Sequence, residues 1–182
     1  MKTENHSRRD VRYGTRIIAF FLIAGGLLGI LNSVLMGFHF AHQQQSPRVV
    51  STVVAAALFT WGILAGVALW RSTSRGFKWA KLLFALQVPV FSIVHVSYEF
   101  STFFSLRVMI GNTTRYIGAD IGSSSNLYWF PESLGLMFGV NIVAVIALLF
   151  LIRGSRFASV EISEQSASPT ESTSSVVAGV HA

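Results

Sequence analysis

The stretch LLFALQVPVFSIVHVSYE, residues 82–99, decides how the rest of the chain is interpreted. It holds no Asp, Lys or Arg, its only Glu is its last residue, and it approaches the ~20 residues that a helix needs to cross the hydrocarbon core of a bilayer. It also carries more polar groups than the other apolar stretches of the chain. Because polar groups inside a bilayer face other helices or a cavity, we expect a transmembrane helix at the centre of a bundle.

The composition is typical of a membrane protein. Of the 182 residues, 52% are hydrophobic and 12% are charged, and an average soluble domain has about twice that charged fraction. Four stretches lack charged residues, and each is near the length that crosses a bilayer. We therefore predict an all-α integral membrane protein, an antiparallel bundle of four transmembrane helices. The predicted spans are residues 17–38, 49–70, 79–103 and 132–152.

The positions of the basic residues predict the orientation. Eleven of the fourteen Lys and Arg residues lie in 1–16, 71–81 and 153–156. Such residues collect on the cytoplasmic side, so we expect a basic cytoplasmic N-terminus over 1–16 and both termini inside the cytoplasmic (inner) membrane. The net charge of +6 then indicates topology and attraction to anionic lipid, with the bilayer and not nucleic acid as the partner.

Residues 104–121 alternate between apolar and polar side chains around Gly111 and Asn112. This pattern predicts a short extracytoplasmic β-hairpin between the third and fourth helices. Its apolar face is expected to cover the outer helix ends and Glu99. A covered carboxylate needs a partner, so Glu99 is expected to pair with Arg107 or Arg115. The Ser/Thr-rich residues 154–182 predict a disordered cytoplasmic tail.

Small residues recur every four positions in the first apolar stretch, which predicts close packing against another helix. They are Gly25, Gly29, Ser33 and Gly37. In the third stretch, Pro89 is expected to kink the helix. Gln87 is expected to form an interhelical hydrogen bond with Asn32 or Asn141.

Four ionisable residues are expected near the outer interface: His39, His42, His95 and Glu99. Within a helix, their spacings of three and four residues place each pair on one face. Imidazole and carboxylate groups suit zinc or copper, or a proton relay. No cofactor is predicted beyond such a metal ion, and the absence of cysteine excludes thiolate and iron–sulfur sites. The alternative is that the histidines contact lipid head groups and Glu99 is solvated.

The sequence contains no catalytic motif of the HExxH, P-loop or GxSxG type. The leading prediction is therefore a non-enzymatic membrane protein, either a structural or accessory subunit or a homo-oligomer. Assembly would use the small-residue helix faces and the free edges of the hairpin. The alternative is a transporter or sensor with an outward-facing metal or proton site built from His39, His95 and Glu99.

Overall fold

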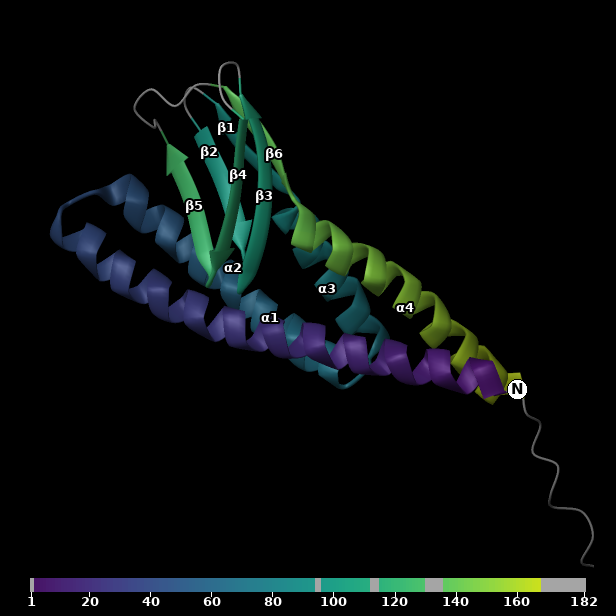
Figure 1. Cartoon of the computed structure of the whole chain (residues 1–182). Helices are drawn as coiled ribbons and strands as arrows, with labels where there is room; N and C mark the ends of the chain where they lie inside the picture. Colours follow the sequence, from purple (N-terminus) through teal and green to yellow (C-terminus); the bar gives the residue numbers. More distant parts are fainter. Residues whose placement is uncertain (1, 94–95, 112–114, 130–135, 168–182) are drawn as a thin grey trace, which may run out of the picture.

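The computed structural model of the chain describes residues 2–93, 96–111, 115–129 and 136–167. These residues form four helices and six strands (Figure 1). The helices are α1 (Lys2–His42), α2 (Ser46–Trp70), α3 (Ser74–Gln87) and α4 (Ile142–Ala167). The strands are β1 (Pro89–Ile93), β2 (Val96–Ser101), β3 (Phe104–Gly111), β4 (Arg115–Ile121), β5 (Ser124–Trp129) and β6 (Met137–Asn141). The predicted all-α four-helix bundle is therefore wrong.

Helices α1 and α2 form a long antiparallel hairpin (Figure 1). Small residues allow the close approach, since a Cβ on Gly29 would lie 2.3 Å from the ring of Phe59, and one on Gly66 would lie 3.0 Å from the carbonyl of Ala19. Among the described residues, these are the two helices long and apolar enough to cross a membrane. Only 33% of the most apolar window of each is buried, so most of its apolar residues face outward.

The expected third transmembrane helix changes into strands after Gln87. Pro89 has no N–H with which to continue the helix, and it is instead the first residue of β1. The residues that follow are rich in Val, Ile, Phe and Tyr, which favour strands. The predicted span over 79–103 therefore consists of the second half of α3 followed by β1 and β2. Pro89 marks a change of secondary structure and does not kink a helix.

The expected fourth span is also divided, between β6 and α4. Asn141 ends β6, and its Oδ1 accepts hydrogen bonds from the N–H groups of Val143 at 3.2 Å and Ala144 at 3.4 Å. An Asn side chain in this position is an N-cap, which satisfies backbone donors at the start of a helix. Gln87 bonds to Thr102 instead of to Asn141 or to Asn32, which is exposed on α1, so the predicted interhelical bond is wrong.

Helix α4 continues to Ala167 and so occupies the first part of the predicted disordered tail. The remainder of that tail, 168–182, lies outside the described residues. Residues 132–135, at the start of the predicted fourth span, also lie outside them. The predicted boundary at residue 154 is therefore not the end of the ordered helix.

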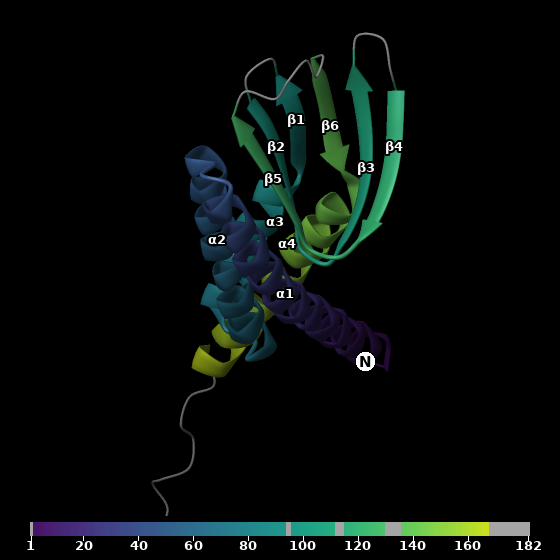
Figure 2. The same ribbon diagram turned by 90° about the vertical axis from the view of Figure 1, so that its left-hand side faces the viewer.

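The six strands form one antiparallel sheet with the order β4-β3-β6-β1-β2-β5. Strands β3 and β4 pair as the sequence predicts, with Phe104 opposite Ile121 and Ile110 opposite Arg115. However, they are part of a larger sheet and not an isolated hairpin. The sheet curls into a half-barrel (Figure 2). Helix α3 leads directly into the central strand β1, and the central strand β6 leads directly into α4. These two helices therefore join the sheet to the helical layer.

Two tight connections form the base of the half-barrel: residues 102–103 between β2 and β3, and residues 122–123 between β4 and β5. The N–H of Gly122 donates to the carbonyl of Phe103, which joins the two connections. Ser123 Oγ donates to the carbonyl of Gly25, and a Cβ on Gly25 would lie 2.9 Å from the backbone nitrogen of Phe103. The base of the sheet therefore rests directly on α1.

Gln87 connects the same base to α3. Its side chain is 1% exposed, and its Nε2 donates to Thr102 Oγ1 at 3.0 Å. Its Oε1 accepts a longer bond from the N–H of Thr102 at 3.4 Å. A buried glutamine with partners for both ends of its amide is well satisfied. Gln87 thus joins a helix to the sheet, and not one helix to another.

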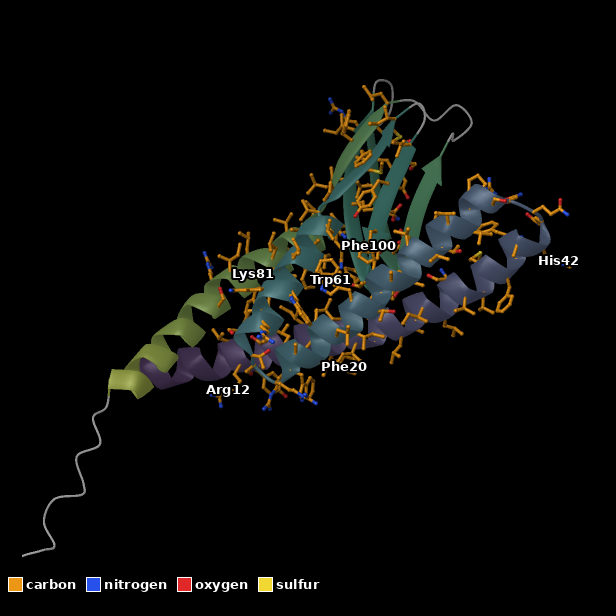
Figure 3. The ribbon with its side chains drawn as sticks, turned by 180° about the vertical axis from the view of Figure 1, so that it is seen from behind. Arg12, Phe20, His42, Trp61, Lys81 and Phe100 are labelled. Carbon is orange, nitrogen blue, oxygen red and sulfur yellow. The ribbon has the colours of Figure 1, made fainter. Side chains whose placement is uncertain are left out.

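The hydrophobic core lies where the helical hairpin, α3 and β2 meet. Phe59 of α2 and Phe100 of β2 are almost fully buried, and their ring centroids are 5.1 Å apart. Figure 3 shows Phe100 on the side of the sheet that faces the helices. Leu22, Leu69 and Leu83 complete the core from α1, α2 and α3. This packing holds one wall of the half-barrel against the helices.

Candidate functional site

Alternation along the strands gives the sheet one polar and one apolar face. Residues that lie opposite one another in adjacent strands share a face. Ser105 lies opposite Asp120, and Ser92 lies opposite Ser97. By this register the polar face carries Val90, Met109 and Met137 and the following polar side chains: Ser92, Ser97, Glu99, Ser101, Ser105, Arg107, Asp120 and Ser124.

The polar face is the concave one. Arg107 on β3 forms ion pairs with Glu99 on β2 and with Asp120 on β4. Strands β6 and β1 lie between β3 and β2, so on a flat sheet β3 and β2 would be ~14 Å apart. Contact between Arg107 and Glu99 therefore requires the sheet to curl toward the face that carries them. The curl of the sheet is visible in Figure 2.

The Arg107–Glu99 pair is shielded from solvent. The side chains of Arg107 and Glu99 are 12% and 11% exposed, whereas that of Asp120 is 50% exposed. Ser124 Oγ donates a further hydrogen bond to Glu99 Oε1 at 3.3 Å and lies 2.9 Å from Ser101 Oγ. Because the pair is mostly buried, each charge depends on the other for solvation. The outer pair with Asp120 depends on it far less.

Three buried polar atoms on the concave face have no hydrogen-bond partner among the described residues. They are Ser92 Oγ, Ser105 Oγ and Arg107 Nε. Ser92 is 4% exposed and Ser105 is 0% exposed. Buried hydroxyl and N–H groups are ordinarily bonded to protein or to ordered water. The concave face therefore has hydrogen-bonding capacity left for water or a small polar molecule.

The opposite, convex surface carries a cluster of exposed apolar side chains that we call the convex apolar face. It lies on β3, β4 and β6, and its residues are Phe104, Val108, Ile110, Ile117, Ile121, Phe138 and Val140. Their exposure runs from 37% for Val108 to 81% for Ile121. The sequence predicts that the apolar face of residues 104–121 covers the outer helix ends, and this is wrong because that face points outward.

The pairing predicted for Glu99 is confirmed with Arg107. Arg115 lies at the other end of β4 from Asp120 and is exposed. The reason for the pairing differs from the predicted one. Glu99 is covered because the sheet curls around its own polar face, and not because a hairpin closes over the ends of the helices.

Three of the four residues predicted to bind a metal lie in the described part of the chain, on two separate elements, α1 and β2. His39 and His42 are exposed at the end of α1, and His39 Nε2 lies 3.1 Å from Gln43 Nε2. Figure 3 shows His42 at the tip of the helical hairpin. Glu99 is paired with Arg107 in the sheet, and His95 lies outside the described residues. The described part of the chain holds no group of three or more metal-binding side chains.

Sequence reasoning missed the serines of the concave face. Their signal is the alternation in β2, where Val96, Tyr98 and Phe100 interleave with polar residues. Alternation of this kind is typical of a strand with two unlike faces. The length of the apolar stretch 82–99 favoured a transmembrane helix instead, and the shorter period was missed.

No protein-family model, curated protein or solved structure matches this chain. Its function is therefore argued from the fold, the curled sheet and the two unlike faces of that sheet.

Proposed function

We propose that the chain is a non-enzymatic membrane protein, an accessory or self-assembling subunit that holds an open β-sheet on a helical anchor. The observation that carries this proposal is the pair of edge strands. β4 and β5 have no strand beyond them among the described residues. Edge strands expose N–H and C=O groups that pair readily with another chain, and β4 carries neither the Lys nor the Pro that commonly blocks such pairing.

The helical hairpin supports attachment to a membrane, since α1 and α2 are long and apolar enough to cross it. Near the start of α1, residues from three helices come together: a Cβ on Gly154 of α4 would lie 3.4 Å from Val11 and 3.5 Å from Phe77 of α3. The basic residues of these segments include Arg12, Arg16, Lys78, Lys81 and Arg153. By the positive-inside rule we place this end in the cytoplasm, with both termini, and the tip of the hairpin outside the inner membrane.

Assembly is assigned to the sheet edges because the small-residue ridge of α1 is used within the chain. Gly26 and Gly29 approach Ile63 and Phe59 of α2. Gly25 is covered by the base of the sheet, and Ser33 is 5% exposed. Little of this ridge is therefore accessible to a second chain.

A photo-reactive amino acid at Ile117 on β4 tests the proposal, with the same residue at the outward-facing Leu31 on α1 as the control. Purification from native membranes in a mild detergent should give a particle heavier than one chain. Crosslinks to a second copy or to a co-purifying protein are expected at Ile117 and not at Leu31. A strict monomer by light scattering, with no crosslink from Ile117, contradicts the proposal.

A transporter or sensor is the second candidate. Ser92 Oγ, Ser105 Oγ and Arg107 Nε favour it, because they have no hydrogen-bond partner in the described part of the chain. Arg107 is paired with Glu99, which belonged to the predicted metal or proton site. Metal analysis of protein purified without chelators tests the metal form of this candidate. A stoichiometric ion that is lost in Glu99→Gln but retained in Asp120→Asn would favour it over the first.

A further inference from the structure

We infer that the convex apolar face lies against the acyl chains of the lipid bilayer, so that the half-barrel stands inside the membrane beside α1 and α2. This inference rests on the proposed function in one respect, the crossing of the membrane by the helical hairpin. It goes beyond that function by assigning an occupant to an exposed surface of the sheet.

The first argument is the depth at which the sheet is attached. Its base contacts Gly25, which follows Arg16 by nine residues in α1, or ~13 Å of helix. The hydrocarbon core is ~30 Å thick. With Arg16 at the cytoplasmic interface, the base lies almost half-way through the hydrocarbon, and ~17 Å of it remain above the base.

The second argument is the reach of the strands. Strand β3 has 8 residues, which extend ~26 Å, or ~18 Å along the membrane normal at the ~45° tilt usual for membrane strands. That distance matches the hydrocarbon left above Gly25. Helix α3 also leads into the central strand β1, and the two together reach ~37 Å, more than the ~30 Å thickness of the hydrocarbon core.

The third argument is the chemistry of the two faces. An apolar outer face and a polar inner face are the pattern of a barrel wall in a membrane, the reverse of a barrel that fills its interior with apolar side chains in water. The convex apolar face has no charged residue except Arg115 at its margin. Arg115 is the first residue of β4, at the end farthest from the base, where it would reach the outer head groups.

The fourth argument is continuity. The outward-facing residues of the helical hairpin, such as Leu31 and Val53, are exposed and apolar like those of the sheet. The two surfaces meet where Phe103, at the base of the sheet, packs on Phe21 of α1 with ring centroids 4.9 Å apart. A bilayer that covers one of these surfaces is positioned to cover both. The open edges of β4 and β5 must then face the polar concave side of the sheet or pair with another strand, because unpaired backbone is costly in hydrocarbon.

Single spin labels test the inference directly, because the chain contains no cysteine. Labelled cysteines at Val108, Ile117 and Phe138 report on the convex apolar face. Matched labels at Leu31 and Val53 report on the helical hairpin. A label at Gln44, exposed in the connection between α1 and α2, provides the aqueous reference. Each variant is reconstituted in phosphatidylcholine–phosphatidylglycerol liposomes, and collisions with oxygen and with a water-soluble nickel chelate are measured by electron paramagnetic resonance.

We expect the sheet labels to match the helix labels, with an oxygen-to-nickel collision ratio several-fold above that at Gln44. Nickel access at the sheet labels with lipid exposure at Leu31 and Val53 would overturn the inference and leave the membrane anchor intact. Nickel access at both sets would overturn the anchor as well. Protection from both reagents at Val108 and Phe138, which lie on strands inside the sheet, would identify a protein as the occupant and would also overturn the inference. Circular dichroism verifies that each labelled chain is folded.

Discussion

Arg107 and Glu99 form an ion pair across the concave face of the sheet, although two strands separate the strands that carry them. The pair therefore joins two walls of the half-barrel that no backbone ladder connects. Near the base, the two-residue connection between β2 and β3 holds the same walls together. The connection between β4 and β5, residues 122–123, joins the same two walls. The curvature of the sheet is thus held by two short connections at the base and by one buried ion pair above them.

Replacing Arg107 with Met is expected to destabilise the fold by about 3–5 kcal/mol, the usual result of removing one partner from a buried ion pair. Glu99 is 11% exposed and would lose the guanidinium that solvates it. Thermal unfolding in detergent micelles, followed by circular dichroism, measures the change.

Asp120→Asn is the matched control for the Arg107 substitution. Asp120 also contacts Arg107, but it is 50% exposed, so its loss is expected to cost at most ~1 kcal/mol. The double variant Glu99→Gln, Arg107→Met should recover part of the lost stability, because no buried carboxylate remains. Equal effects of Arg107→Met and Asp120→Asn would show that burial does not strengthen the inner pair.

The fold was only partly predictable because hydropathy measures how apolar a segment is, not which backbone it adopts. Residues 82–99 are apolar enough for a transmembrane helix, yet the chain leaves the helix after Gln87. Pro89 and the alternation in β2 are the local signals of that change. Strands β3 and β4 were predictable since their alternation surrounds a turn and their partners are neighbours in sequence.

The site was predictable only where elementary electrostatics required it. A covered Glu99 needs a cation, and Arg107 supplies it. The rest of the concave face depends on pairings between distant segments, such as Val90 with Gly139 and Met109 with Gly139. No local pattern in the sequence records these pairings. The metal-site prediction assumed that its residues lie on neighbouring helices, whereas His39 belongs to a helix tip and Glu99 to a strand of the sheet.

Gln87→Leu is expected to lower the free energy of unfolding by about 1–3 kcal/mol, because it removes the hydrogen-bond partner of a buried threonine. Gln87 and Thr102 are 1% and 6% exposed, so water does not readily replace the amide. Asn32→Leu, at an exposed position of α1, is the control and should not destabilise the chain, because it leaves no buried polar group without a partner. Denaturant unfolding of both variants in micelles gives the comparison, and similar values for the two would contradict the role assigned to Gln87.

Gly25→Ala is expected to destabilise the chain by about 1–3 kcal/mol through overpacking. The added Cβ would lie 2.9 Å from the backbone nitrogen of Phe103, which cannot rotate away as a side chain can. Gly37→Ala in the same helix is the control. Its Cβ would meet only Thr52 Oγ1 at 3.3 Å, so the gain of ~1 kcal/mol in helix propensity should offset the contact. Thermal unfolding should therefore separate the two variants, and a neutral Gly25→Ala would mean that the sheet base does not press on α1.

Ile117→Lys places a charge on the convex apolar face, at a side chain of β4 that is 73% exposed. If that face contacts acyl chains, the charge should cost up to about 2–4 kcal/mol near the bilayer midplane, and less toward the interface. If the face were in water, a surface substitution of this kind would change stability by only ~0.5 kcal/mol. Ser97→Lys is the matched control, because Ser97 lies on the polar concave face, where water or polar side chains can solvate an ammonium group. Unfolding by urea from liposomes should therefore show a large loss in the free energy of unfolding for Ile117→Lys and a small loss for Ser97→Lys. A small loss for both variants would place the convex apolar face outside the bilayer.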